Sequence, residues 1–330
     1  MKRCVYGGDL CMATAEQIKN LVKAYIDRND ERFKTIVLQI AAHESKLGHE
    51  NLARELKIQI NRIDNKRISS NQFASNNPML AMSCSKYSFS ELIVSEEISD
   101  KVKRILKEYR NRNKLQAYGL ANRRKILLEG YPGTGKTFTA SIIASELSIP
   151  LYTVQMDKLV TKFMGETSSK LRQIFDSIQS VVGVYLFDEF DAIGADRNLD
   201  NEVGEMRRIL NSFLQFIEQD YPESIIIAAT NNKKLLDQAL YRRFDDVLHY
   251  TLPTQCEIQK LLEYKLVSYD EKFLITRELI KAAEGLSHAE IVRVCDDIVK
   301  SSILDDNVLT TKNIIYTFYE RRNIYSLKEV

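Results

Sequence analysis

The chain has 330 residues, of which 44% are hydrophobic and 28% are charged, and its formal net charge is +2. This length is enough to bury the cores of roughly two to three modules of ~100–200 residues each. No apolar run approaches the ~20 residues that span a bilayer, and the first residues lack the continuous apolar segment of a secretory signal. We therefore expect a globular protein that is neither exported nor inserted in a membrane.

The five cysteines form no recognisable site. Cys4, Cys11, Cys84, Cys256 and Cys295 are scattered, without a CxxC pair and without histidines at metal-ligand spacing. This spacing argues against a disulfide framework and against a zinc site. Reduced thiols are the usual state in the cytosol, so a cytoplasmic location is expected.

Residues 12–63 are predicted to form an N-terminal helical bundle. Apolar residues recur there with the i, i+3, i+4, i+7 spacing of amphipathic helices, in three series that begin at Ile18, Phe33 and Leu52. Residues 64–90 then become polar, with several serines and asparagines and one proline. That composition favours a linker over a packed element.

Residues 91–253 alternate short apolar strands with amphipathic helices, which predicts an α/β sheet with helical crossovers. The expected strands are residues 125–129, 151–155, 183–187, 224–229 and 247–250. From residue 254 to 330 the pattern is helical only, at about 254–268, 276–284, 287–303 and 310–321. Between Glu96 and Lys125 ten basic residues face four acidic ones, which indicates either a solvated helix face or a surface for nucleic acid or a partner.

The stretch 130-GYPGTGKT-137 fits the pattern GxxxxGK[ST] between a predicted strand and a predicted helix. Glycines at these positions let backbone N–H groups surround phosphate oxygens at the positive end of a helix. Lys136 is expected to reach the β- and γ-phosphates of a nucleotide, and Thr137 to ligate Mg²⁺. The residues predicted to contact the nucleotide here are Gly130, Pro132, Gly133, Thr134, Gly135, Lys136, Thr137 and Phe138.

Two further apolar strands end in polar residues. The stretch 183-GVYLFDEFDAIG-194 places Asp188 at a strand end, where it is predicted to bind Mg²⁺ directly or through water. Glu189 is the candidate general base that polarises the attacking water. Asn231, at the end of 224-SIIIAATNN-232, is expected to orient that water. The alternative for Thr230 and Asn231 is that they only cap a turn.

In this order and spacing, GYPGTGKT, LFDEFDAIG, AATNN and 236-LDQALYRRFDD-246 resemble the AAA branch of the AAA+ ATPases, over residues 91–303. The resemblance implies the P-loop NTPase fold, with a parallel five-stranded sheet and helices on both faces. Residues 91–253 would then be the large ATPase subdomain and residues 254–330 its helical lid. It also implies ATP and Mg²⁺ as ligands and a homo-oligomeric ring, normally a hexamer.

The same resemblance assigns residues in the arginine and lid motifs. The run ALYRRFDD is similar to the katanin and spastin arrangement, in which Arg242 and Arg243 match arginine fingers that neutralise γ-phosphate charge in the neighbouring subunit. The alternative is a pair of surface salt-bridge arginines. In the lid, SHAE stands where the family usually has SGAD. His288 therefore replaces a small residue near the base and ribose, whereas Ala289 matches.

The stretch 162-KFMG-165 matches the family's first pore loop, whose Lys162, Phe163, Met164 and Gly165 are expected to grip a polypeptide substrate. By composition alone a Phe-Met pair belongs more often to a core.

The chain also resembles a bacterial group often associated with subtilisin-like serine peptidases, which implies such a protease as a partner. By analogy with related remodellers, the N-terminal bundle is expected to be a partner or substrate adaptor. Its alternative is a packing or oligomerisation module.

The leading hypothesis is thus an ATP-driven motor that remodels proteins by pulling polypeptide through a ring. One alternative is a nucleic-acid-associated AAA+ ATPase, which the basic residues of 101–125 favour. Against it, the sequence has no zinc pattern, no helix-turn-helix tail and no interleaving of aromatic and basic residues. The other alternative is an ATP-dependent regulatory switch that threads nothing.

Overall fold

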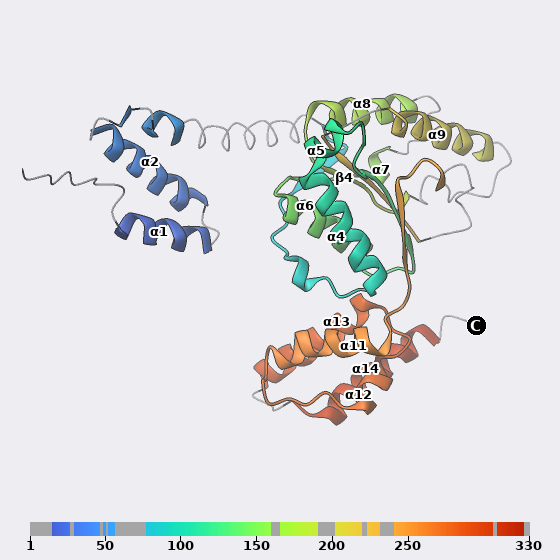
Figure 1. Cartoon of the computed structure of the whole chain (residues 1–330). Coiled ribbons are helices and arrows are strands. Elements are labelled where there is room, and N and C mark those ends of the chain that lie inside the picture. Colours follow the sequence, from blue (N-terminus) through green and yellow to red (C-terminus); the bar gives the residue numbers. More distant parts are fainter. Residues whose placement is uncertain are drawn as a thin grey trace, which may run out of the picture. The chain divides into compact units, whose positions relative to one another are not determined.

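The computed structural model describes residues 15–26, 30–46, 49–50, 52–56, 77–159, 166–190, 202–219, 223–231, 241–305 and 309–326. The chain divides into two compact units, Met1–Ser75 and Asn76–Val330. In the first unit, α1 (Ala15–Ile26) and α2 (Asp30–Lys46) occupy two of the three helical segments predicted for the bundle, and residues 52–56 of the third are helical (Figure 1). These helices bury small and aliphatic residues, among them Ala24, Val37 and Ala41. What this unit binds stays a prediction.

The second unit is built on one six-stranded sheet with the strand order β1-β3-β4-β5-β2-β6. The strands are β1 (Leu80–Ser83), β2 (Lys125–Gly130), β3 (Leu151–Val154), β4 (Val184–Phe187), β5 (Ile225–Thr230) and β6 (Asp246–Tyr250). Strands β2 to β6 pair with one another in parallel. Helices lie in the connections from β2 to β3, from β3 to β4 and from β4 to β5, and return the chain to the same end of the sheet, as parallel pairing requires. The predicted α/β fold class is confirmed.

Strand β1 corrects the prediction in two respects. It lies inside the segment 64–90 that was expected to be a linker, and it pairs antiparallel with β3. The sheet is therefore mixed and has six strands, where five parallel strands were predicted. The sequence signal is weak because the strand is only 4 residues long and polar residues flank it. Its stability comes from pairing with a strand about seventy residues away, starting where the Gln155 N–H donates to the Met79 carbonyl at 2.9 Å.

Helices cover both faces of the sheet. On one face α4 (Glu96–Arg110) and α6 (Lys136–Leu147) pack on a core that contains Ile105, Leu128 and Ile227, all fully buried. On the other face lie α8 (Glu166–Ser180) and α9 (Glu202–Ile217), which contact each other. Their aromatic rings pack on β4, with the centroids of Phe187 and Phe213 5.1 Å apart. Shorter elements are η1 (Phe89–Glu91), α5 (Arg112–Ala117) and α7 (Met156–Leu159).

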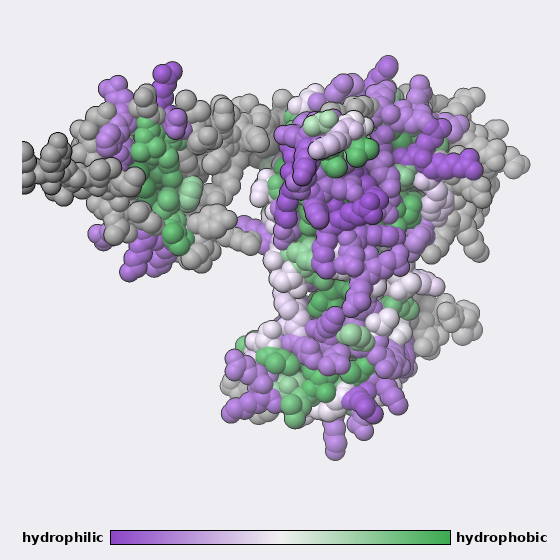
Figure 2. All heavy atoms as spheres, in the orientation of Figure 1, coloured by the Kyte–Doolittle hydropathy of each residue, from purple (hydrophilic) through white to green (hydrophobic). Residues whose placement is uncertain are grey.

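The basic stretch at residues 101–125 is largely a solvated and ion-paired surface. Hydrophilic residues dominate the exposed side of α4 (Figures 1 and 2), whereas its apolar side is buried against the sheet. At least six of the ten basic residues in this stretch pair with carboxylates; these are Lys101, Lys103, Arg104, Arg110, Arg112 and Arg123. Local pairing reduces the net positive field that a nucleic-acid surface needs. The structure thus favours the solvated-face interpretation.

The C-terminal part is all helical, as predicted. It contains α11 (Gln255–Leu262), the π-helical turn η4 (Glu263–Val267), α12 (Arg277–Ala283), α13 (His288–Leu304) and α14 (Thr311–Ser326). These elements surround a separate apolar core that includes Leu262, Ile291 and Phe318. Side chains cap the helices, because Thr254 and Ser287 each form a capping box with the glutamate three residues later.

Candidate active site

Three neighbouring parallel strands end at the same edge of the sheet. β2 ends at Gly130, β4 at Phe187 and β5 at Thr230, and β5 lies between the other two. Asp188 and Asn231 are the residues that follow β4 and β5. Ligands of open α/β sheets bind at this edge, beyond the carboxyl ends of the strands. The structure therefore brings the glycine-rich loop and both predicted strand-end residues to one edge.

The loop at residues 131–135 forms a turn that needs glycine at two of its positions. Gly133 has φ 72° and Gly135 has φ 99°, a region in which other L-residues are strained. Thr134 is fully buried and its hydroxyl donates to the Tyr131 carbonyl at 2.7 Å, which closes the turn. The turn leads directly into α6. Backbone N–H groups at such a helix start form a concave site that favours anions.

Lys136 lies inside this turn. Its side chain is 6% exposed, and its Nζ donates to the carbonyls of Gly130 and Tyr131 at 2.9 and 2.7 Å. A buried ammonium needs such partners to offset its lost hydration. The strand before the turn is equally constrained, because a Cβ on Gly130 would lie 2.0 Å from the carbonyl oxygen of Tyr250 on β6. Both the lysine and the glycine of the motif are thus fixed by their surroundings.

The predicted metal-binding pair is in direct contact. The Thr137 hydroxyl donates to Asp188 Oδ2 at 2.7 Å, although the two residues are far apart in sequence. The other carboxylate oxygen of Asp188 accepts from the Glu189 N–H at 2.9 Å. Glu189 is exposed and has φ 49°, an uncommon conformation for a residue other than glycine that is often found at functional sites. Hard oxygen ligands of this kind suit Mg²⁺, which usually takes one or two protein ligands beside phosphates.

The start of α13 closes over the glycine-rich loop. The Ala289 N–H donates to the Gly133 carbonyl at 2.9 Å, and a Cβ on Gly133 would lie 2.6 Å from the Ser287 hydroxyl. Between them, His288 has both ring nitrogens buried without a hydrogen-bond partner among the described residues. Burial lowers its pKa, against an opposing effect of the nearby Glu257 carboxylate. Ser287 and Ala289 of the lid motif therefore lie against the loop, whereas the predicted place of His288 near the base and ribose stays a prediction.

Comparison with known proteins identifies the architecture. Residues 126–252 match the family described as "ATPase family associated with various cellular activities (AAA)". An uncharacterized AAA family ATPase of Sinorhizobium fredii is 34% identical over 304 residues, which cover 89% of this chain and 91% of the relative. The chain belongs to the AAA family of ATPases. Its enzymatic activity is ATP hydrolysis.

Other AAA relatives are longer proteins. A putative 26S proteasome regulatory subunit homolog of Methanothermobacter marburgensis is 30% identical over 206 residues, 60% of this chain and 55% of that protein. The ATP-dependent zinc metalloprotease FtsH of Mycoplasma mobile is 30% identical over 237 residues, 68% of this chain and 33% of that protein. Among solved structures, the FIGL-1 AAA domain superposes with a TM-score of 0.56 at 20% identity, covering 76% of this chain and 86% of that one. The fold is thus that of an AAA+ ATPase.

The two predicted arginine fingers differ in their surroundings. Both side chains are exposed. Arg243 forms an ion pair with Glu218, just beyond the end of α9 in the same chain, whereas within the described residues Arg242 has no such carboxylate partner. Exposed ion pairs contribute about 0–1 kcal/mol, so this pair is easily exchanged for another anion. The predicted pore-loop residues Lys162, Phe163, Met164 and Gly165 lie outside the described residues.

Sequence reasoning missed several residues that lie around the site. Ser287 contacts the loop at Gly133, and Tyr87 packs edge-on against the predicted residue Phe138, with the ring centroids 4.8 Å apart. Glu129, the residue before Gly130, is buried and hydrogen-bonded to Tyr241 and His249. The only signal in the sequence was the position of Glu129, since a carboxylate inside the buried strand ILLE is unusual.

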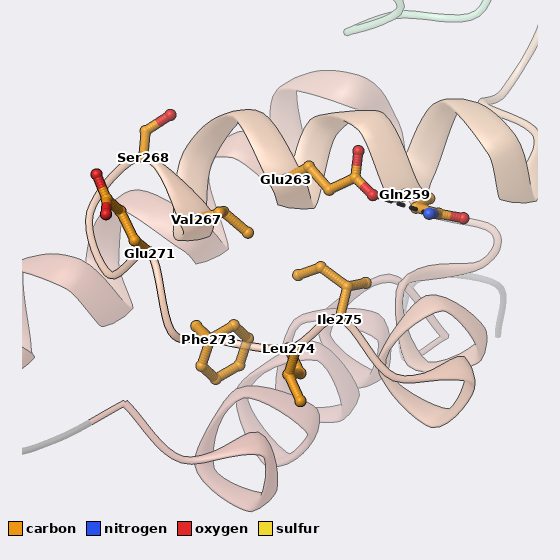
Figure 3. Close-up of a pocket in the computed structure, with 8 residues that line it drawn as sticks. All are labelled: Gln259, Glu263, Val267, Ser268, Glu271, Phe273, Leu274 and Ile275. Atoms are coloured by element: carbon orange, nitrogen blue, oxygen red, sulfur yellow. Dashed lines mark hydrogen bonds between the residues drawn. The ribbon is translucent and has the colours of Figure 1, made fainter.

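A groove on the lid is a separate feature. It has a volume of about 630 Å³ and is lined by Gln259, Glu263, Val267, Ser268, Glu271, Phe273, Leu274 and Ile275 (Figure 3). None of the predicted site residues lines it. In the part of the chain that the structure describes, no helix is long and apolar enough to cross a membrane, and no cluster of three or more histidine, cysteine or carboxylate residues forms a metal site of its own.

Proposed function

We propose that this AAA ATPase couples Mg²⁺-dependent ATP hydrolysis to the remodelling of polypeptides, acting as a homo-oligomeric ring, a hexamer in the usual form of the family. The observation that carries the hydrolytic part is the 2.7 Å hydrogen bond between Thr137 and Asp188, which unites the glycine-rich loop with the acidic strand end. The remodelling part is supported by the likeness to a proteasome regulatory subunit homolog and to FtsH. The proposed location is the cytoplasm.

The residues of the site divide the hydrolytic work. Thr137 and Asp188 would hold Mg²⁺, which neutralises phosphate charge when bound. Lys136, anchored at the centre of the turn by two carbonyls, places a positive charge where the β- and γ-phosphates bind. Glu189 accepts a proton from the attacking water, and Asn231 orients that water from the neighbouring strand end.

The lid residues complete the nucleotide site. Ala289 is fixed to the loop through Gly133, and this contact keeps the imidazole of His288 close to the loop. Because burial lowers the pKa of His288, the ring is neutral at pH 7. A neutral imidazole has one donor and one acceptor nitrogen, which suits a ribose hydroxyl or the edge of a base better than a phosphate. His288 thus takes over, through its side chain, a place that a small residue usually holds.

The proposed role of the two arginines requires an oligomer as the active form. Arg242 and Arg243 are exposed and lie after β5 in the chain, far in sequence from the phosphate loop. In the proposed ring they stabilise the charge that develops on the γ-phosphate bound by the neighbouring subunit. Substrate contact is assigned to Lys162, Phe163, Met164 and Gly165 in the pore. A subtilisin-like serine protease is the proposed partner, on the basis of the N-terminal helical module and the lid sequence GLSHAEI.

The decisive experiment combines an ATPase assay with an unfolding assay. The substrate is a fluorescent protein carrying an unstructured tag, and its ATP-dependent loss of fluorescence reports remodelling. Phe163→Ala should keep ATP turnover while unfolding is lost, because an aromatic side chain grips the extended chain. If the Phe163→Ala variant itself fails to fold, the Phe163 side chain belongs to the hydrophobic core. If this variant unfolds the tagged substrate at the normal rate, or if the wild type hydrolyses ATP without unfolding the substrate, the result would favour a regulatory switch.

A further inference from the structure

A buried carboxylate lies directly before the glycine-rich loop. Glu129 is 1% exposed and is the second-last residue of β2, followed by Gly130. One of its oxygens accepts from the Tyr241 hydroxyl, and the other is paired with Nδ1 of His249 on β6. Glu129 and His249 are partners in the parallel register of the two strands. Both polar side chains therefore lie on the same face of the sheet.

The chemistry of this cluster defines which groups donate. In its ionised form Glu129 only accepts hydrogen bonds, so the Tyr241 hydroxyl donates to it, and His249 donates in the tautomer that carries its proton on Nδ1. Burial, together with the hydrogen bond to Glu129, raises the pKa of Tyr241 to about 12, which keeps the hydroxyl protonated. Removing one partner from a buried charge is costly, because the charge loses hydration that nothing else replaces. The three side chains are thus held together as a unit.

The cluster joins two functional segments of one chain. Tyr241 directly precedes Arg242 and Arg243, and we call these three residues the finger segment. Glu129 directly precedes the loop that holds Lys136. On the other side of β2, Glu129 is in register with Thr230, the residue before Asn231. A single carboxylate therefore connects the strand of the phosphate loop to the finger segment, across 112 positions of sequence.

We propose that Glu129 is a positioning residue, which fixes the finger segment to the strand that carries the phosphate loop of the same subunit. The proposal rests on the proposed function, in which Arg242 and Arg243 act on ATP in the neighbouring subunit. As a consequence, the position of the arginines that one subunit supplies to its neighbour depends on the nucleotide site of the subunit that supplies them. The Tyr241 hydroxyl makes the contact with Glu129 that holds the finger segment in place, and His249 holds the other oxygen of the carboxylate.

The test uses mixed oligomers, in which each subunit type has one role. Acceptor subunits carry Arg242→Ala and Arg243→Ala and keep an intact loop. Donor subunits carry Glu189→Gln, so that they bind ATP and supply arginines but do not hydrolyse. Each type alone should be inactive, and the mixture should hydrolyse ATP. If the mixture is inactive although it assembles, the trans action of the arginines fails, and with it that part of the proposed function.

With an active mixture, Tyr241→Phe is added to the donor only. We expect at least about a tenfold loss of ATP turnover, since displacing a positioned group by ~1 Å costs up to about 10²-fold. The same substitution in the acceptor should have no effect, because the acceptor supplies no arginines. The matched control is Tyr185→Phe in the donor, which removes another buried hydroxyl that donates to backbone carbonyls of the same unit.

A second donor variant separates position from folding. Glu129→Gln retains an acceptor for the Tyr241 hydroxyl and should keep more activity than Glu129→Ala, while its affinity for a fluorescent ATP analogue should match that of the parent donor. Full activity of the Tyr241→Phe donor would overturn the proposal. So would an equal loss with Tyr185→Phe, or a loss that appears only when Tyr241→Phe is placed in the acceptor, because these results would indicate general destabilisation or a role in the subunit's own site.

Discussion

The contact between the lid and the phosphate loop can be tested by replacing Gly133 with alanine. Gly133 has φ 72°, which costs an L-residue about 1–2 kcal/mol. Its new Cβ would also lie 2.6 Å from the Ser287 hydroxyl and 3.3 Å from the Ala289 Cβ, and relieving such overpacking costs about 1–3 kcal/mol more. Gly135→Ala is the matched control, because Gly135 has φ 99° and nothing within 4 Å of the added Cβ. It should lose only the strain energy.

The free energy of unfolding, measured with urea on the full chain, should therefore fall by about 2–5 kcal/mol for Gly133→Ala and by about 1–2 kcal/mol for Gly135→Ala. Adding Ser287→Gly to Gly133→Ala should restore about 1 kcal/mol or more, since glycine removes the clash and costs only a few tenths at an N-cap. Equal losses for the two alanine variants, together with no gain from Ser287→Gly, would refute the closed contact between the lid and the loop.

Three further predictions concern nucleotide chemistry and thiol reactivity. Lys136→Ala should abolish binding of a fluorescent ATP analogue, because the charge at the centre of the loop is lost. Glu189→Gln should bind the analogue normally but hydrolyse ATP about 10²–10⁴-fold more slowly, and normal turnover would remove Glu189 as the base. Cys84 and Cys256, which are exposed, should be alkylated by iodoacetamide in the native protein. Cys295 should react only after denaturation, because burial raises its pKa to about 12 and the thiolate is the reacting species.

Much of the fold and the core of the site could be predicted because their signals are local. The five parallel strands are apolar runs between amphipathic helices, and the loop motif joins a strand to a helix within one short stretch. Strand β1 was missed because its stability depends on pairing with β3, and β-propensity is weak information without the partner. Glu129 was missed as a site residue for the same reason, since its partners lie 112 and 120 positions away.

In the proposed mechanism, the phosphate loop is the segment from which a nucleotide-driven movement would spread. Within five residues, the loop and its strand contact the lid through the Gly133 carbonyl and the finger segment through Glu129. Hydrogen bonds weaken steeply when their geometry changes, so a small displacement of the loop on nucleotide binding would alter both contacts. In the proposed ring, the lid and the arginines of one subunit would therefore respond to the same nucleotide, which is the coupling that a ring needs if its subunits are to act in sequence.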